Sequence, residues 1–313
     1  MKIALIVPFL DEERYMRRFL DSLERQTRLP DRVLLVDDGS TDGSPRIAAD
    51  FADRRPYASL LSRPQRGGTS DRLAAASEYQ AFQWAAQRLD GDYDVVAKLD
   101  ADLVLTPETL ATVERELEAD ARLGIAGAYL SVEAGGTQVR ERCPPYHVRG
   151  ATKFYRRDCL HEIAPIPAIL GWDTIDETAA RLHGWRTASF AIDGGDPLHL
   201  RPTGAADGRL RAFRRWGACA YAAGFHPAWL CLSAARQMLE RPWGLSGASF
   251  LAGWALAALQ RRPRAAPEIR AQLRREQAAR VRAALLTRPS GLRRASAEAP
   301  EKVPEAARRS GAD

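Results

Sequence analysis

Cysteine is scarce in this chain, and none of its four cysteines stands in the C-x-x-C spacing typical of zinc sites and redox motifs. No charged and then apolar leader of the kind that directs secretion precedes the first strand-like run. We therefore expect free thiols in a reduced, cytosolic protein, which excludes a disulfide scaffold. The 313 residues, 45% hydrophobic and 27% charged, predict a globular chain of about two domains.

Acidic residues are scarce in the last third of the chain. Up to residue 200 there are 25 Lys and Arg residues against 32 Asp and Glu residues, whereas the remainder has 21 against 8. The acidic part argues against a nucleic-acid groove, and the Arg-rich part needs an anionic partner such as phosphate, nucleic acid or a lipid surface. After residue 261 the arginines lack the interleaved aromatic side chains on which bases stack, so we expect no nucleic-acid partner.

Short β-rich runs alternate with segments of helical spacing through the first 120 residues. Strands are expected at residues 2–7, 32–36, 58–61 and 94–99, and helices at residues 13–25, 44–52, 70–89 and 107–119. This alternation predicts an α/β fold with a mostly parallel sheet and helices on both faces. Ligands of such sheets bind at the carboxyl ends of the strands, where this sequence places polar, carboxylate-rich segments.

Two carboxylates one residue apart, Asp100 and Asp102, follow the strand expected at residues 94–99. Mg²⁺ and Mn²⁺ prefer oxygen ligands, and proteins hold such ions with one or two carboxylates together with substrate phosphates. The pair therefore indicates half of a cation site that a diphosphate would complete. An ordinary turn can carry the same pattern, so the pair alone leaves both interpretations open.

Three motifs in this order resemble those of the family-2 glycosyltransferases. They read IVPFLDEE at residues 6–13, VDDGSTD at residues 36–42 and KLDAD at residues 98–102. The resemblance extends from residue 2 to about residue 187. It implies the GT-A fold and an inverting enzyme that takes its sugar from a nucleotide-sugar donor, with Mg²⁺ or Mn²⁺ as cofactor.

The resemblance also implies which residues form the donor and metal sites. The donor-binding residues would be Pro8, Asp11, Glu13, Asp37, Asp38, Arg72 and Asp100. The metal ligands would be Asp102, Asp100 and, as in some related transferases, a later histidine, here His199. A solvated arginine and an ordinary loop histidine are the alternatives for Arg72 and His199.

An inverting transfer needs one carboxylate that takes the proton of the acceptor hydroxyl. Relatives carry this base in a Glu-Asp motif at the start of a helix, and the matching stretch here reads GWDTIDE at residues 171–177. Trp172 replaces the first acid, so Asp173 aligns best with the base, followed by Asp176 and Glu177. The alternative for these acids is a favourable interaction with the helix dipole.

Two long stretches after residue 210 lack charged side chains. Residues 216–235 and 242–260 contain no Asp, Glu, Lys or Arg, and each is close to the length of ~20 residues that spans a bilayer. Proline and glycine interrupt them, and arginines and tryptophans accompany them, so we expect helices lying on or dipping into an anionic membrane surface. A buried helical hairpin and true spanning helices are the alternatives.

We predict three parts: a GT-A catalytic domain at residues 1–210, a helical membrane-surface region at residues 211–287 and a disordered tail at residues 288–313. The sequences RPTGAADG at 201–208 and GFHP at 224–227 resemble bacterial family members that extend lipid-linked surface polysaccharides. That resemblance implies a lipid-linked saccharide or other glycan as acceptor, and a peripheral location on the cytoplasmic face of the cell membrane. Transfer onto polyprenyl phosphate, or non-catalytic nucleotide-sugar binding, are the alternatives.

Overall fold

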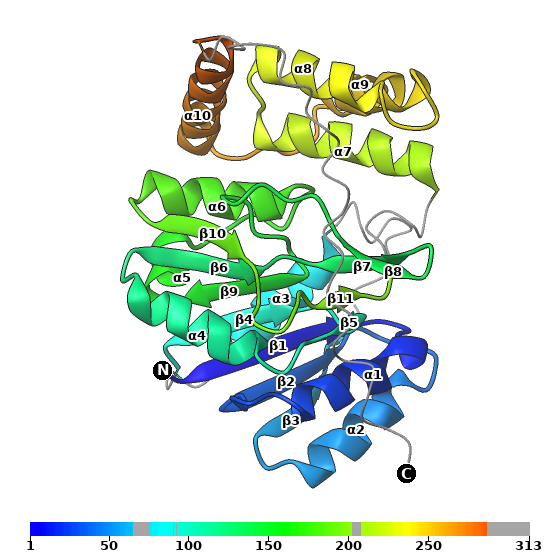
Figure 1. Ribbon diagram of the computed structural model, residues 1–313, viewed down its shortest axis with the longest axis vertical. Coiled ribbons are helices and arrows are strands. Elements are labelled where there is room, and N and C mark those ends of the chain that lie inside the picture. Colours follow the sequence, from blue (N-terminus) through cyan, green and yellow to red (C-terminus); the bar gives the residue numbers. More distant parts are fainter. Residues whose placement is uncertain (65–75, 90, 92, 202–207, 287–313) are drawn as a thin grey trace.

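A seven-stranded sheet forms the centre of the α/β part in this computed structural model, which describes residues 1–64, 76–89, 91, 93–201 and 208–286 (Figure 1). Its strands are β1 (Ile3–Phe9), β2 (Arg32–Asp37), β3 (Ala58–Ser62), β4 (Val95–Leu99), β6 (Leu123–Ala128), β9 (Thr152–Arg156) and β10 (Arg186–Phe190). They are ordered β10-β6-β9-β4-β1-β2-β3. Only β9 runs antiparallel to its neighbours among these strands, so the predicted mostly parallel α/β sheet is confirmed.

Helices cover both faces of this sheet, because its central strands are apolar at nearly every position. They are α1 (Glu13–Glu24), α2 (Ser44–Arg54), α3 (Ser77–Ala86), α4 (Thr109–Ala119), α5 (Arg157–Ile163) and α6 (Trp172–Leu182). Ile3, Leu5 and Val7 of β1 pack with α1, α2 and α4. Ala4 and Ile6 point the other way and share a core with α3, α5 and α6.

A second, four-stranded sheet lies beside the first. It consists of β5 (Leu103–Val104), β7 (Ser131–Ala134), β8 (Thr137–Arg140) and β11 (Leu198–His199), ordered β5-β11-β7-β8. The chain leaves the first sheet after β6 and enters the second sheet as β7. Gly135 and Gly136, both with positive φ, form the turn between β7 and β8. This sheet pairs His199 with Leu103 and so brings the end of β11 to the segment that follows β4.

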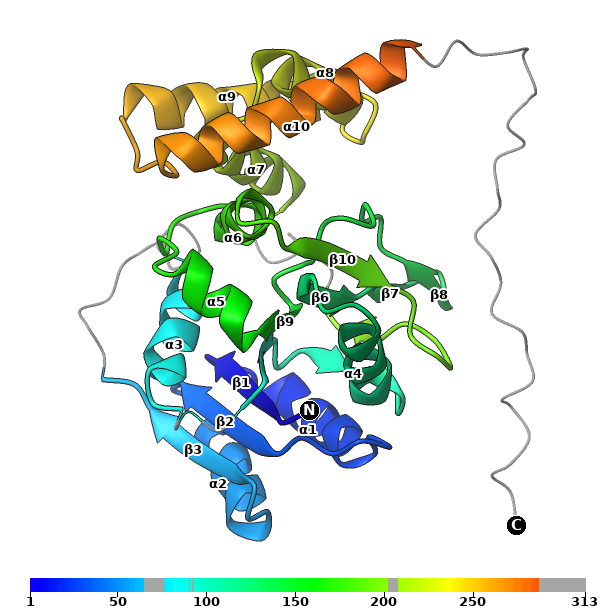
Figure 2. The same cartoon turned by 90° about the vertical axis from the view of Figure 1, so that its left-hand side faces the viewer.

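Four helices after the second sheet form a separate layer over α6, as both views show (Figures 1 and 2). They are α7 (Arg209–Ala223), α8 (Pro227–Gln237), α9 (Leu245–Leu259) and α10 (Pro267–Leu286). Helices α7 and α9 cross so closely that a Cβ on Gly217 would lie 1.8 Å from the Phe250 carbonyl oxygen. A Cβ on Gly253 would lie equally close to the Arg214 carbonyl oxygen, so this crossing requires glycine at both positions.

The helical layer is joined to the α/β part mainly through α10. The Arg181 guanidinium of α6 pairs with Glu276 of α10 at 3.0 Å, and Leu273 of α10 is buried in the core that α6 shares.

Within the described part of the chain, no helix is both long enough and apolar enough to cross a membrane. The tail predicted at residues 288–313 lies outside the described residues.

Candidate active site

A cavity of about 790 Å³ lies where the carboxyl ends of the central strands meet the helical layer. Pro8, Asp38 and Asp100, from the ends of β1, β2 and β4, line it together with Asp173 at the start of α6. The helical layer contributes Ala212, Arg215, Trp216, Cys219, Ser233, Gln237 and Phe250 to its wall. The α/β part and the helical layer therefore enclose the same space.

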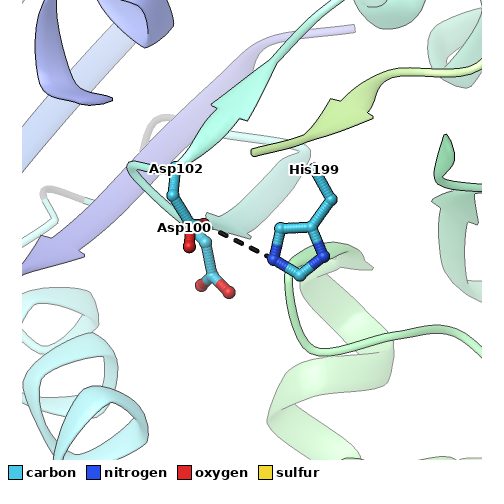
Figure 3. A group of neighbouring side chains, drawn as sticks. All are labelled: Asp100, Asp102 and His199. Carbon is cyan, nitrogen blue, oxygen red and sulfur yellow. Dashed lines mark ion pairs between the residues drawn. The ribbon is translucent and has the colours of Figure 1, made fainter. Parts of the chain in front are cut away.

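Three side chains in this cavity form a cluster that can hold a metal ion (Figure 3). Asp100, Asp102 and His199 each offer one ligand atom, and these atoms all lie within 4.8 Å of one another. The Nε2 atom of His199 is 3.6 Å from Oδ1 of Asp102, the pair joined by the dashed line in Figure 3. The pairing of β11 with β5 is what brings His199 to the aspartates, almost 100 residues away in the sequence.

The chemistry of these donors fits a divalent cation. Oδ1 of Asp102 is buried without a hydrogen-bond partner, so it has capacity for another contact. Nδ1 of His199 lies 3.7 Å from Oε2 of Glu141, and a carboxylate behind the second ring nitrogen is the usual setting of a metal-ligating histidine. Burial and the charge of Asp100 raise the pKa of Asp102, a crowding of negative charge that a cation would relieve.

Two buried lysines form the floor of the site. Lys98 on β4 and Lys153 on β9 are direct partners in the antiparallel pairing of these strands, and both are fully buried. Lys98 pairs with Asp100, and Nζ of Lys153 donates a hydrogen bond of 2.8 Å to the carbonyl oxygen of Asp173. The ring of Trp172 lies 5.6 and 5.2 Å from the two Nζ atoms. One pair of lysines therefore supports both the metal cluster and the start of α6.

The three acids at the start of α6 lie in different surroundings. Asp173 lines the cavity, whereas Asp176 and Glu177 are buried below it. Asp176 accepts hydrogen bonds of 2.8 and 3.0 Å from Lys153 and one of 2.5 Å from the hydroxyl group of Tyr155. Of these acids, Asp173 is therefore the one positioned to meet a substrate.

Glu177 is held by contacts of its own. Its Oε1 atom accepts a hydrogen bond of 2.6 Å from the backbone N–H of Val148, and its Oε2 atom lies 3.1 Å from Nδ1 of His147. Burial alone would raise the pKa of Glu177, but the charges of His147 and Lys153 outweigh it and lower that pKa to about 2. Glu177 is thus an ionised anchor for the segment before β9.

Three of the proposed donor-binding residues tie the strand-end loops together and do not line the cavity. Asp11 has a φ of 54°, a conformation that Asn and Asp tolerate best after glycine, and accepts a hydrogen bond of 2.7 Å from the Thr41 N–H. Glu13 accepts one of 3.0 Å from the Gly43 N–H. Asp37 accepts from the N–H groups two and three residues further on. These contacts shape the pocket from behind.

The other donor-binding candidates are divided between the cavity and the undescribed part of the chain. Pro8 and Asp38 line the cavity, and Oδ1 of Asp38 pairs with Nη1 of Arg63 at 2.8 Å. Arg72 lies outside the described residues. The sequence motifs did not assign Lys98 or Lys153 to the site, although a lysine near the end of the otherwise apolar run at residues 95–99 was a visible signal for Lys98.

Glu12 and Arg201 are two further members of the site; both lie within quoted motifs, which did not assign them to the metal cluster. Arg201 pairs with Asp102 at 2.9 Å and also with Glu12. Burial raises the pKa of Glu12 to about 7, despite the opposing charge of Arg201. The position of Glu12, within the acidic run that follows β1, was the available sequence signal.

Comparison with known proteins places these features in context. The sequence model of Glycosyl transferase family 2 matches residues 4–165. The uncharacterized glycosyltransferase EpsJ of Bacillus subtilis is 33% identical over 94 residues, which are 29% of this chain and 26% of that protein. The uncharacterized glycosyltransferase YibD of Escherichia coli is 30% identical over 122 residues, 38% of this chain and 32% of that protein. The matched segments thus span less than a third of either relative.

Among solved structures, the chain is similar to the mannosyltransferase PcManGT from Pyrobaculum calidifontis, determined in complex with GDP-Man and Mn²⁺. The TM-score is 0.57 at 19% sequence identity, and the match covers 83% of this chain and 88% of that one. At this identity the likeness shows a shared fold. It extends beyond the 162 residues of the family match.

Proposed function

Because this chain belongs to glycosyl transferase family 2, we propose that it transfers one sugar, with inversion, from a nucleotide-sugar donor to a saccharide carried by a membrane lipid. One observation carries the proposal. A single cavity contains the cluster of Asp100, Asp102 and His199 and also the carboxylate of Asp173. A donor diphosphate and an acceptor hydroxyl can therefore be bound in the same space.

On the donor side, Pro8 and Asp38 would contact the nucleoside at the ends of β1 and β2. Asp102, His199 and Asp100 would hold Mg²⁺ or Mn²⁺, and such a cation neutralises the charge that develops on the leaving diphosphate. Lys98 fixes the carboxylate of Asp100 through their ion pair.

On the acceptor side, Asp173 would act as the general base. It takes the proton from the acceptor hydroxyl, whose oxygen forms a bond to the anomeric carbon. The bond from that carbon to the diphosphate breaks at the same time, and its electron pair leaves with the nucleoside diphosphate, which inverts the configuration. Lys153 positions the base, because its ammonium group holds the backbone carbonyl of Asp173 at 2.8 Å.

The helical layer supports a lipid-linked acceptor. Trp216 and Phe250 give part of the cavity an apolar wall, and Gln237 at the end of α8 also lines it. Met238 and Leu239, which follow Gln237 directly, are exposed to solvent. Apolar side chains of this layer thus lie both in the cavity wall and on the outside, which suits an acceptor with a lipid tail and a sugar head.

The outer surface of the helical layer suits an anionic membrane, which we propose as its partner at the cytoplasmic face of the cell membrane. The exposed large apolar residues of α8, α9 and the segment between them are Leu232, Met238, Leu239, Trp243, Leu245, Leu256 and Leu259. Arginines at positions 236, 241, 261, 262 and 264 stand near them in the sequence. Apolar side chains among cationic ones bind interfaces that contain anionic lipid, and each arginine near such a surface adds ~1 kcal/mol.

Vesicle flotation tests this membrane partner. We expect the full chain to float with vesicles of phosphatidylcholine and phosphatidylglycerol at low salt, and to float less at high salt. Trp243→Glu, at a side chain that is 64% exposed, should prevent flotation. Leu29→Glu is the matched control, because Leu29 is also exposed but lies in the α/β part. A wild-type chain that stays with the soluble fraction at low salt contradicts the proposal.

Turnover with a panel of nucleotide sugars tests the chemistry. We expect one donor to be hydrolysed slowly without acceptor, and its sugar to be transferred to a polyprenyl-diphosphate-linked saccharide with the opposite anomeric configuration. NMR of the product reports that configuration, and retention would refute the single displacement. Transfer to polyprenyl phosphate alone would identify the other acceptor class. Binding of a nucleotide sugar without any turnover would remove the enzyme assignment.

A further inference from the structure

The positively charged guanidinium of Arg201 lies against Asp102, which would be a ligand of the metal ion. Its Nη2 and Nε atoms lie 2.9 and 3.1 Å from Oδ2 of Asp102, and Nη2 also pairs with Oε1 of Glu12. The guanidinium thus bridges two buried carboxylates at the edge of the cluster formed by Asp100, Asp102 and His199.

The balance of charge explains this bridge. Three carboxylates, Glu12, Asp100 and Asp102, lie close together, and buried negative charges need cationic partners. Lys98 serves Asp100 and is 0% exposed, so it has no route away from its partner. The side chain of Arg201 is 41% exposed, so it is the cation that can leave when another one arrives.

Backbone contacts show that only the side chain has to move. The N–H of Leu200 donates a hydrogen bond of 2.9 Å to the carbonyl oxygen of Asp102, and His199 is paired with Leu103. The segment that carries His199 therefore stays fixed beside Asp102. A cation bound through Oδ2 of Asp102 would meet the guanidinium directly, and one bound through Oδ1 would be repelled by its charge.

We propose that Arg201 is a built-in competitor of the metal ion, an inference that rests on the metal site of the proposed function. In the free enzyme its guanidinium neutralises Asp102 and Glu12. When metal and donor bind together, the guanidinium leaves Asp102 and pairs with the donor's diphosphate. Glu12 retains Arg201 at the edge of the cavity during this exchange, because its contact with the guanidinium does not involve the metal ligands.

This exchange couples binding of the metal ion to binding of the nucleotide. The metal ion displaces a favourable ion pair when it binds alone, whereas bound nucleotide offers the released guanidinium a new anionic partner. Each ligand therefore strengthens the binding of the other, and the coupling is reciprocal. Metal without nucleotide should bind weakly.

Mn²⁺ binding to the full chain without nucleotide, followed by electron paramagnetic resonance, tests the first half. We expect Arg201→Ala to bind Mn²⁺ about tenfold more tightly than the wild type, because the competing charge-assisted contact is gone. Arg142→Ala is the control: Arg142 lines the same cavity, and its removal takes away the same charge without touching Asp102. An affinity in Arg201→Ala that is unchanged, lower, or raised only as much as in Arg142→Ala overturns the proposal.

Binding of UDP and GDP in saturating Mn²⁺ tests the second half. There Arg201→Ala should bind the nucleotide that the wild type prefers about tenfold more weakly, because a charge-assisted contact to phosphate is lost. A variant that tightens metal binding and weakens nucleotide binding is not merely unfolded. If wild type and Arg201→Ala both fail to bind Mn²⁺, the metal site and this inference both fall. If both bind Mn²⁺ equally well, the metal site stands and the competition is refuted.

Discussion

Asp173 and Asp176 lie within one turn of α6, and we expect substitution of the first to affect catalysis and substitution of the second to affect stability. The Asp173 carboxylate lines the cavity and has no hydrogen bond or ion pair within the part of the chain that the structure describes. Asp176 is fully buried and accepts hydrogen bonds from Lys153 and Tyr155. We expect Asp173→Asn to lose transfer but remain stable, and Asp176→Asn to be destabilised.

The magnitudes follow from these contacts. Removing one partner of a buried ion pair costs about 3–5 kcal/mol, because the other charge remains buried. Glu177 still lies 3.4 Å from the Lys153 ammonium in Asp176→Asn, so we expect about 3 kcal/mol, the lower end of that range. For a domain of this size that corresponds to a melting temperature about 6–12 °C lower. A positioned general base contributes roughly 10²–10⁴-fold to the rate, which is the loss expected for Asp173→Asn.

Two measurements on each purified variant decide the matter. Thermal unfolding gives the stability, and transfer at saturating donor, well below the melting temperature, gives kcat. Donor binding by calorimetry should be unchanged in Asp173→Asn. The reasoning is refuted if Asp173→Asn keeps normal turnover, or if Asp176→Asn melts like the wild type and loses only activity, which would move the base to Asp176.

Three further predictions concern the metal, the helical layer and pH. Chelation should abolish donor hydrolysis, with Mn²⁺ or Mg²⁺ restoring it in the wild type but not in Asp102→Ala, whose rate should be about 100-fold lower. Gly217→Ala should cost about 1–3 kcal/mol in chemical unfolding, because its Cβ meets the Phe250 carbonyl at 1.8 Å, whereas a Cβ at the control position Gly91 meets nothing within 4 Å. The lowered pKa of Glu177, about 2 against 4.5, makes its stabilising contribution complete above pH 4.5 and lost as pH falls toward 2. As pH is lowered over that interval, the melting temperature should therefore fall more steeply for the wild type than for Glu177→Gln. An equal fall in both proteins would refute this.

The strand-end residues of the site were predictable from the sequence. Pro8, Asp38 and Asp100 each follow a short apolar run, and the carboxyl ends of parallel strands meet at one edge of a sheet. That geometry holds whichever order the strands take, so the motifs alone placed these residues together. His199 was predictable only through the family resemblance, because its approach depends on the two-residue pairing of β11 with β5.

The floor of the site was not predictable by the same route. Lys153 meets Lys98 only because β9 enters the sheet between β4 and β6 in the reverse direction, and the glycine-interrupted segment before β9 does not signal that placement. Asp173 and Asp176, three positions apart, lie on nearly the same side of a helix. They differ in depth of burial, which depends on how far the start of α6 projects toward the cavity.

The two buried lysines, Lys98 and Lys153, have a consequence for how this site can change. Lys98 and Lys153 are fixed by strand pairing and buried beneath Trp172, so their ion pairs with Asp100 and Asp176 are in place before any substrate arrives. Groups that are preorganised in this way need no reorientation when a ligand binds. In the proposed function this support would be the same for every nucleotide sugar that enters the cavity. Selection of the donor would then belong to the loops and helices around the two lysines, where new specificities could arise while this support stays the same.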